Sequence, residues 1–264
     1  MTELKKRVIT GSILIPVVIL PLLLGGYYFL ALIAIFMFGG IVEFLKIRSE
    51  LHFSKLLPLA VFVFLPFLIM ITTSRVQLIY PVLYAIFLPW IIYPFYYSRG
   101  VGIGIYFSLF FEIILLSFAG YSIFKARQYG FWVSVYFFVT IWYFDSACYF
   151  TGRKWGKRRL APLVSPKKTW EGFIGGLISL VPYVFLVKAL HLPGLNDLLF
   201  LFVSAYVISI VGQQGDLAES AIKREAGVKD SSNLFPGHGG ILDRTDSLVA
   251  AAPFYFAILN WLWR

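Results

Sequence analysis

Nine long, mostly apolar stretches recur along this 264-residue chain, and they limit what it can fold into. A helix needs about 20 apolar residues to cross the hydrocarbon core of a bilayer. Backbone in lipid must satisfy its own hydrogen bonds, and the alternating pattern of a transmembrane barrel is absent. With 14% charged residues and a mean hydropathy of +0.82, the chain is expected to be an all-α, polytopic membrane protein. The expected spans are 8–24, 27–45, 56–73, 77–95, 102–120, 131–150, 171–190, 196–214 and 247–263.

The first apolar stretch is expected to stay in the protein as a helix. Lys5-Lys6-Arg7 before an apolar run also resembles the start of a secretory signal. No small-residue cleavage site follows, however, and Gly25-Gly26 leads directly into the second stretch. Cys148 is the only cysteine, which excludes an intrachain disulfide and a cysteine-based metal site.

Basic residues gather in alternate connections between the expected spans. With the N-terminus in the cytoplasm, 18 of the 23 Lys and Arg residues fall on the cytoplasmic side, in agreement with the positive-inside rule. This orientation places the polar segments 151–170 and 215–246 on the cytoplasmic face and the C-terminus outside. We expect a single membrane domain over 1–264, with 1–130 as scaffold and 131–264 as the half that holds the candidate catalytic residues. No nucleic-acid-binding module accompanies the net charge of +10, so nucleic acid is not an expected partner.

The segment 215–246 concentrates polar side chains between two expected spans. Asp216, Ser220 and Lys223 follow helical spacing and so share one helix face, as do Asp243 and Asp246. Each set also fits a solvated helix end or a helix N-terminus, which favours acidic residues. Asp216 and Asp243 leave two helices at the same membrane surface, where they could converge. Mg²⁺ is usually held by one or two carboxylates plus phosphates and water, so the pair predicts a magnesium site.

Zinc is not expected in this segment, because the three histidines of the chain show no ligand spacing. The histidine and the basic residues of the segment allow two interpretations each. His238 lies in a Pro-Gly-His-Gly-Gly turn, either as a structural turn residue or as a catalytic base. Lys223, Arg224 and Lys229 would neutralise phosphates, although each alone is also typical of a solvated surface.

The other polar segment contains Ser165-Pro166-Lys167-Lys168, which predicts a helix start with Ser165 as the cap. The two lysines would then lie in the first turn, where the helix dipole favours anions. A helix N-terminus with two such lysines is suited to bind phosphate.

Three acidic residues lie within or at the ends of other spans. Asp145 either takes part in the site or pairs with Arg153 or Lys154, since an acid in a span is costly unless paired or functional. Glu43 is close to Lys46 in sequence, and the sequence indicates no partner for Glu112.

The order of these motifs is similar to that of a known family. Ser220, Lys223-Arg224, Lys229-Asp230, His238-Gly-Gly and Asp243-Arg-Thr-Asp246 follow the signature spacing of the phosphatidate cytidylyltransferases, or CDP-diacylglycerol synthases. The run from Ser165 to Gly172 also recurs in that family, and the resemblance extends over 145–246. It implies that CTP and phosphatidate react to give CDP-diacylglycerol and pyrophosphate, a step of phospholipid biosynthesis. It also implies a requirement for Mg²⁺, with a second cation left open, and metal positions at Asp216 and Asp243.

The resemblance assigns candidate roles to the polar residues of both segments. The expected catalytic residues are Asp216, Asp243, Asp246, Lys223, Arg224 and His238. The expected substrate-binding residues are Ser165, Lys167, Lys168, Thr169, Glu171, Ser220, Lys229, Asp230, Arg244, Asp145 and Arg153. The expected partners are CTP, phosphatidate and the lipid bilayer, with a homodimer left open. The expected location is a bacterial plasma (inner) membrane, with the site facing the cytoplasm.

Two other functions remain as alternatives. A CTP-dependent lipid kinase would phosphorylate a polyprenol or phytol, and it would need a base for the alcohol nucleophile. A transporter could use Asp145, Glu112 and Glu43 as a path for a coupling ion. Transporters bind near the midplane, however, whereas these polar residues gather at one surface.

Overall fold

The chain is mostly helical and embedded in the membrane. The computed structural model describes residues 3–48, 67, 70–71, 94, 105–235 and 239–263. The described elements are α1 (Glu3–Leu24), α2 (Gly26–Arg48), α5 (Ile105–Gln128), α6 (Phe131–Trp155), β1 (Arg159–Ala161), β2 (Ser165–Thr169), α7 (Trp170–Ala189), α8 (Leu198–Glu225) and α9 (Leu242–Leu262). Within this described part, α2, α6, α7 and α8 are long and apolar enough to cross a membrane. The expected spans 56–73 and 77–95 lie almost wholly outside the described residues.

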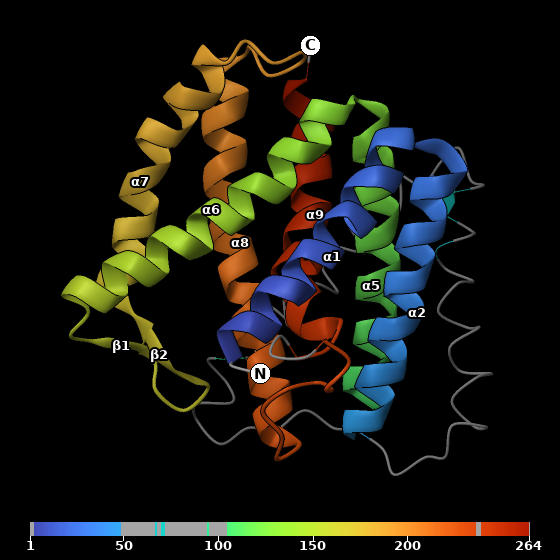
Figure 1. Ribbon diagram of the computed structural model, residues 1–264, viewed down its shortest axis with the longest axis vertical. Helices are drawn as coiled ribbons and strands as arrows, with labels where there is room; N and C mark the ends of the chain where they lie inside the picture. The colour runs from blue at the N-terminus through green and yellow to red at the C-terminus, as the bar shows by residue number, and fades with distance from the viewer. Residues whose placement is uncertain are drawn as a thin grey trace.

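The helices pack around α9 (Figure 1). Helix α8 lies along one side of α9 and α5 along another, α2 packs on α5, and α6 crosses the bundle to pack on α7. Helix α1 runs diagonally over the face formed by α5 and α9 in this view. The β1–β2 hairpin and the loop between α8 and α9 lie at the same end of the bundle, at the bottom of Figure 1. The fold therefore brings the two polar segments of the sequence to one end.

The turn between α1 and α2 is held by an arginine from α5. Gly25 and Gly26 have φ angles of 68° and 49°, which glycine adopts readily. Arg127 donates from Nε to the carbonyl of Leu22 at 2.7 Å and from Nη2 to that of Leu23 at 3.1 Å. These carbonyls belong to the last turn of α1, where no helical N–H group reaches them. Arg127 thus caps α1 and ties its end to α5.

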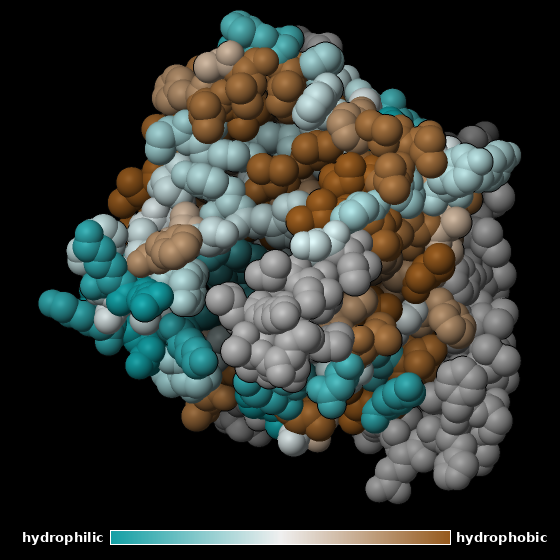
Figure 2. All heavy atoms as spheres, in the orientation of Figure 1, coloured by the Kyte–Doolittle hydropathy of each residue, from teal (hydrophilic) through white to brown (hydrophobic). Residues whose placement is uncertain are grey.

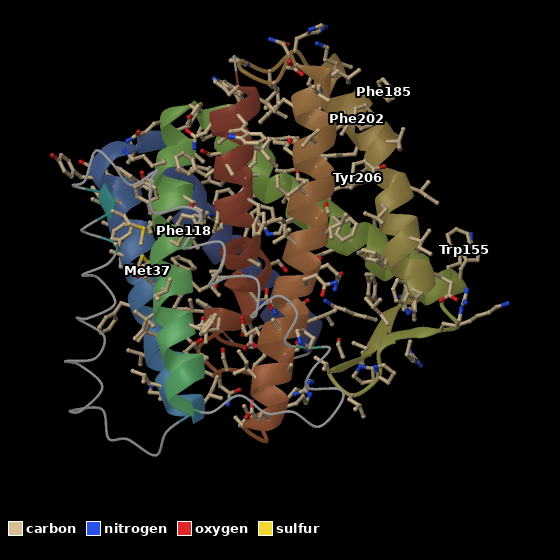
Figure 3. All side chains as sticks on the ribbon, turned by 180° about the vertical axis from the view of Figure 1, so that it is seen from behind. Met37, Phe118, Trp155, Phe185, Phe202 and Tyr206 are labelled. Atoms are coloured by element: carbon tan, nitrogen blue, oxygen red, sulfur yellow. The ribbon has the colours of Figure 1, made fainter. Side chains whose placement is uncertain are left out.

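Aromatic side chains connect α7 to α8 (Figure 3). The rings of Phe185 and Phe202 meet edge to face with centroids 5.7 Å apart. Further along, Tyr206 Oη donates to the carbonyl of Leu177 at 3.1 Å. The hydrophobic effect does not drive helix association in lipid, because lipid tails are as apolar as the side chains. Ring packing and interhelical hydrogen bonds therefore hold α7 and α8 together.

The helix start predicted at Ser165 is wrong. Ser165–Thr169 forms strand β2, which pairs antiparallel with β1, and α7 begins at Trp170. The N–H group of Trp170 donates to the carbonyl of Arg158 at 3.0 Å, which closes the hairpin. The cap is Thr169, whose Oγ1 accepts from the N–H group of Gly172 at 3.1 Å. Figure 2 shows hydrophilic residues gathered around this hairpin, and on β2 the side chain of Lys167 is exposed while that of Lys168 is partly buried.

Candidate active site

An ion pair joins the hairpin to α8. Lys168 Nζ lies 2.5 Å from Asp216 Oδ2, and Ser220 Oγ donates to Asp216 Oδ1 at 3.2 Å. Asp216 and Ser220 are one turn apart on α8, as their spacing predicted. The structure therefore brings residues of both polar sequence segments to one point.

Thr169 and Glu171 shape the hairpin and the start of α7. Glu171 Oε2 accepts from the N–H groups of Lys157 at 2.9 Å and Arg158 at 3.1 Å. Together with the Thr169 cap, these bonds fix the start of α7 against the chain that leaves α6. They position Lys168, which immediately precedes Thr169 on β2.

Asp243 is surrounded by four donors at the start of α9. Lys223 Nζ lies 2.5 Å from its Oδ1, while Oδ2 accepts from Ser231 N, Ser231 Oγ and Gly240 N, each at 2.8 Å. Burial alone would raise the pKa of Asp243, but the Lys223 ammonium and the N–H groups of Gly240 and Ser231 hold that pKa below its usual value. Asp243 is therefore ionised at neutral pH and organises the loop that precedes α9.

Glu43 binds the same loop from α2. Its Oε1 accepts from Ser232 Oγ at 2.7 Å and Ile241 N at 3.0 Å. Its Oε2 accepts from Leu242 N at 3.0 Å and lies 2.8 Å from Ser231 Oγ, whose single proton is shared with Asp243 Oδ2. Glu43 is 5% exposed and thus satisfies buried N–H groups at the N-terminus of α9. Lys46, its neighbour in the sequence, is not its partner.

The Gly239–Gly240 pair lies between these two carboxylates. A Cβ atom on Gly240 would overlap Ser231 Oγ and both carboxylate oxygens of Glu43. A Cβ atom on Gly239, whose φ is 76°, would overlap Asp243 Oδ2. The Gly-Gly sequence is therefore required by the close approach of the loop backbone to Glu43 and Asp243.

Lys223 lies at the centre of a buried acidic cluster. It is 5% exposed, and Nζ lies 3.1 Å from Glu219 Oε1 in addition to its contact with Asp243. Glu112 on α5, 3% exposed, and Asp246 on α9 are within electrostatic range of the same ammonium group. One ammonium group cannot neutralise four ionised carboxylates. The cluster therefore needs some of its carboxyl groups to be protonated or a further cation to bind. The sequence analysis missed this role of Glu112, because Glu112 on α5 meets Lys223 only where α5 approaches α8, whereas the spacing of four between Glu219 and Lys223 on α8 could have indicated their ion pair.

Asp145 and Arg244 lie within electrostatic range of each other near this cluster. The carboxylate of Asp145 is within electrostatic range of Lys168, Asp216 and Arg244. Pairing of Asp145 with Arg153 or Lys154, the alternative suggested by the sequence, is not found among the described residues. Asp145 on α6 therefore belongs with the groups on β2, α8 and α9.

Several predicted site residues make no contact with this cluster in the described part of the chain. Arg224 donates from Nη1 to the carbonyl of Val228 at 2.8 Å, within its own loop. His238 lies outside the described residues. Exposed or partly exposed residues with no described bond to the cluster are Arg153, Ser165, Lys167, Lys229 and Asp230.

The carboxylates at this end of the bundle suit a hard cation. No three His, Cys, Asp or Glu side chains converge as a ligand set among the described residues. Mg²⁺ needs only one or two carboxylates when phosphates supply other ligands. Asp216 and Asp246 lie within electrostatic range of each other, and Asp246 accepts in the described chain only from Ser247 N, at 2.7 Å. The carboxylate oxygens thus fit Mg²⁺ at Asp216. Asp246 accepts fewer hydrogen bonds than Asp243 and so has more free oxygen lone pairs for a metal ion.

Comparison with known proteins relates this geometry to a family. The chain is 47% identical over 135 residues to a phosphatidate cytidylyltransferase of Haemophilus influenzae. This alignment covers 48% of the chain and 45% of that protein. It is 42% identical over 163 residues to a phosphatidate cytidylyltransferase of Bacillus subtilis, in an alignment that covers 61% of this chain and 55% of that protein. The chain spans about half the length of the curated relatives it matches.

A match to a family profile covers far more of the chain than these alignments do. The profile of the Cytidylyltransferase family matches residues 5–262, from the first turns of α1 to the last residue of α9. The helices that hold Asp145, Asp216 and Asp243 all lie within this match. The chain therefore belongs to the cytidylyltransferase family.

Proposed function

We propose that the protein transfers the cytidylyl group of CTP to phosphatidate, giving CDP-diacylglycerol and pyrophosphate. The reaction would take place at the cytoplasmic face of a bacterial inner membrane. The contact between Lys168 and Asp216 is the observation that carries the proposal, because it joins the two polar segments on which the resemblance rests. The names of the bacterial relatives support the same reaction.

The carboxylates are proposed to hold Mg²⁺ through Asp216, with Asp243 or Asp246 and the substrate phosphates completing its ligands. Bound there, the ion would neutralise phosphate charge. Lys168 would then exchange its contact with Asp216 for a phosphate of CTP, assisted by Lys167 on the same strand. Lys223 would keep Asp243 and the loop before α9 in place.

The chemical step needs no strong base. A phosphate oxygen of phosphatidate attacks the α-phosphorus of CTP, and a new P–O bond forms. The bond from the α-phosphorus to the oxygen bridging the α- and β-phosphates breaks, and pyrophosphate leaves with that oxygen. The nucleophile is an anion at neutral pH, so the residues around it have to position it and neutralise charge. The nine spans, the cytoplasmic N-terminus, the homodimer and the second cation stay predictions.

The function is tested by measuring pyrophosphate release from CTP by the purified protein in detergent with Mg²⁺. We expect release that rises with phosphatidate concentration and is absent when diacylglycerol replaces phosphatidate, since diacylglycerol lacks the attacking phosphate. Asp216→Asn protein serves as the inactive control. CTP consumption that needs no lipid phosphate would contradict the proposal.

A further inference from the structure

An apolar cavity of about 200 Å³ lies between α1, α2, α5, α6 and α9. Its described walls include Ile15, Ile33, Leu116, Trp142 and Leu248, one from each of these helices. In Figure 1 these helices surround the region behind α1, and Figure 3 shows Met37, another wall residue, on the face of α2 that adjoins α5. The cavity is separate from the ion pairs described above and takes no part in the proposed chemical step.

One charged side chain lines this cavity among the described residues, and it is Arg244. Arg244 follows Asp243 directly and is within electrostatic range of Asp145, and its guanidinium group has no hydrogen bond or ion pair to another described residue. Thr245, the other polar wall residue on α9, uses its hydroxyl within α9, where Oγ1 donates to the carbonyl of Ile241 at 2.9 Å. Arg244 thus connects the apolar cavity with the polar end of the molecule.

The chemistry of these walls selects an amphiphilic occupant. An apolar cavity gives water no hydrogen-bond partners and accepts a hydrocarbon group instead. A guanidinium group with five N–H donors binds a phosphate oxygen pair in preference to a neutral group. A ligand that satisfies both has a hydrocarbon chain next to an anionic phosphate headgroup.

We infer that an acyl chain of phosphatidate occupies this cavity while its phosphate binds Arg244, an inference that rests on the proposed function. The lipid would then approach the site from the α1–α2–α5–α9 side. CTP would approach from the opposite side, where Lys167 and Lys168 lie on the hairpin. The site would bind its two phosphate-bearing substrates on different elements, with Asp216 and Asp246 between them.

A pair of substitutions on α2 tests the cavity. Ile33 is 6% exposed and lines the cavity, whereas Ile35 is 64% exposed two residues further along the same helix. Ile33→Trp is expected to lower the ratio of kcat/KM for long-chain over short-chain phosphatidate about tenfold, since each excluded methylene group loses burial. Ile35→Trp, the matched control, should leave this ratio within about twofold of wild type. An unchanged ratio in an Ile33→Trp protein with normal KM for CTP would overturn the inference.

Substitution of Arg244 tests the headgroup and does not depend on a change in the core. Arg244→Gln is expected to raise KM for phosphatidate about tenfold or more while KM for CTP stays within about twofold, because a charged hydrogen bond to phosphate is lost. A rise in KM for CTP alone, or no change in either constant, would overturn the assignment. If Ile33→Trp fails to fold, the KM values of Arg244→Gln still test where phosphatidate binds. A wild-type protein that never consumes phosphatidate would contradict the proposed function itself.

Discussion

Asp216→Asn is expected to abolish turnover, lowering kcat by about a thousandfold or more, while the protein stays folded. Asp216 is where the hairpin meets α8, through Lys168, and where Ser220 donates to the same carboxylate. An amide of the same shape keeps the contact with Ser220, but it removes the charge required for Mg²⁺ and for Lys168. The measurement is Mg²⁺-dependent turnover of CTP and phosphatidate, alongside the midpoint of thermal unfolding.

Asp197→Asn is the matched control, because Asp197 begins the same helix at its other end. Its Oδ1 accepts from the N–H group of Phe200 at 2.9 Å as the N-terminal cap of α8. Asn caps helices about as well as Asp, so neither stability nor turnover should change much. Near-normal turnover in Asp216→Asn would remove this carboxylate from the site.

Glu43→Gln is expected to lower kcat about a hundredfold, with a smaller effect on either KM, because it displaces the loop that holds Asp243. Glu43 accepts four hydrogen bonds, two of them from the N–H groups of Ile241 and Leu242. A glutamine would turn its NH₂ group toward one serine hydroxyl and one backbone N–H group, and the N–H group cannot accept a hydrogen bond from it. Leaving buried donors unpaired costs about 1–3 kcal/mol, so the unfolding midpoint should also fall.

The split between kcat and KM separates positioning from a general loss of folded protein. Lys46→Gln changes an exposed charge one turn further along α2 and should alter neither constant. Glu43→Asp keeps the charge and should restore part of the lost kcat, although its shorter side chain cannot reach all four donors. Equal activity of wild type and Glu43→Gln at matched folded fraction would show that Glu43 has no part in positioning Asp243.

The sequence predicted the helices well where one physical property determines them. Seven apolar stretches coincide with described helices, because a long apolar run in lipid has few alternatives to a helix. The spacing of Asp216 and Ser220 likewise predicted their shared face, since both lie within one helix. The motif residues also indicated the family, to which the profile match assigns the chain.

Contacts between distant segments could not be predicted in this way. Ser165-Pro166 has the local pattern of a helix start, but pairing of β2 with β1 outweighs that local preference. The partners of Glu43 lie 188 to 199 positions away in the sequence. Lys223 resembles a solvated phosphate ligand in sequence, and only the packing of α8 against α9 buries it against Asp243.

The fate of the phosphates of CTP tests the central claim most directly. The protein is incubated with phosphatidate, Mg²⁺ and CTP labelled at either the α- or the γ-phosphate, and the lipid is then extracted. The account predicts that the α-label enters the lipid in a one-to-one ratio with pyrophosphate, while the γ-label stays in the aqueous phase. Transfer of the γ-label to lipid, with release of CDP, would instead identify a lipid kinase and contradict the account.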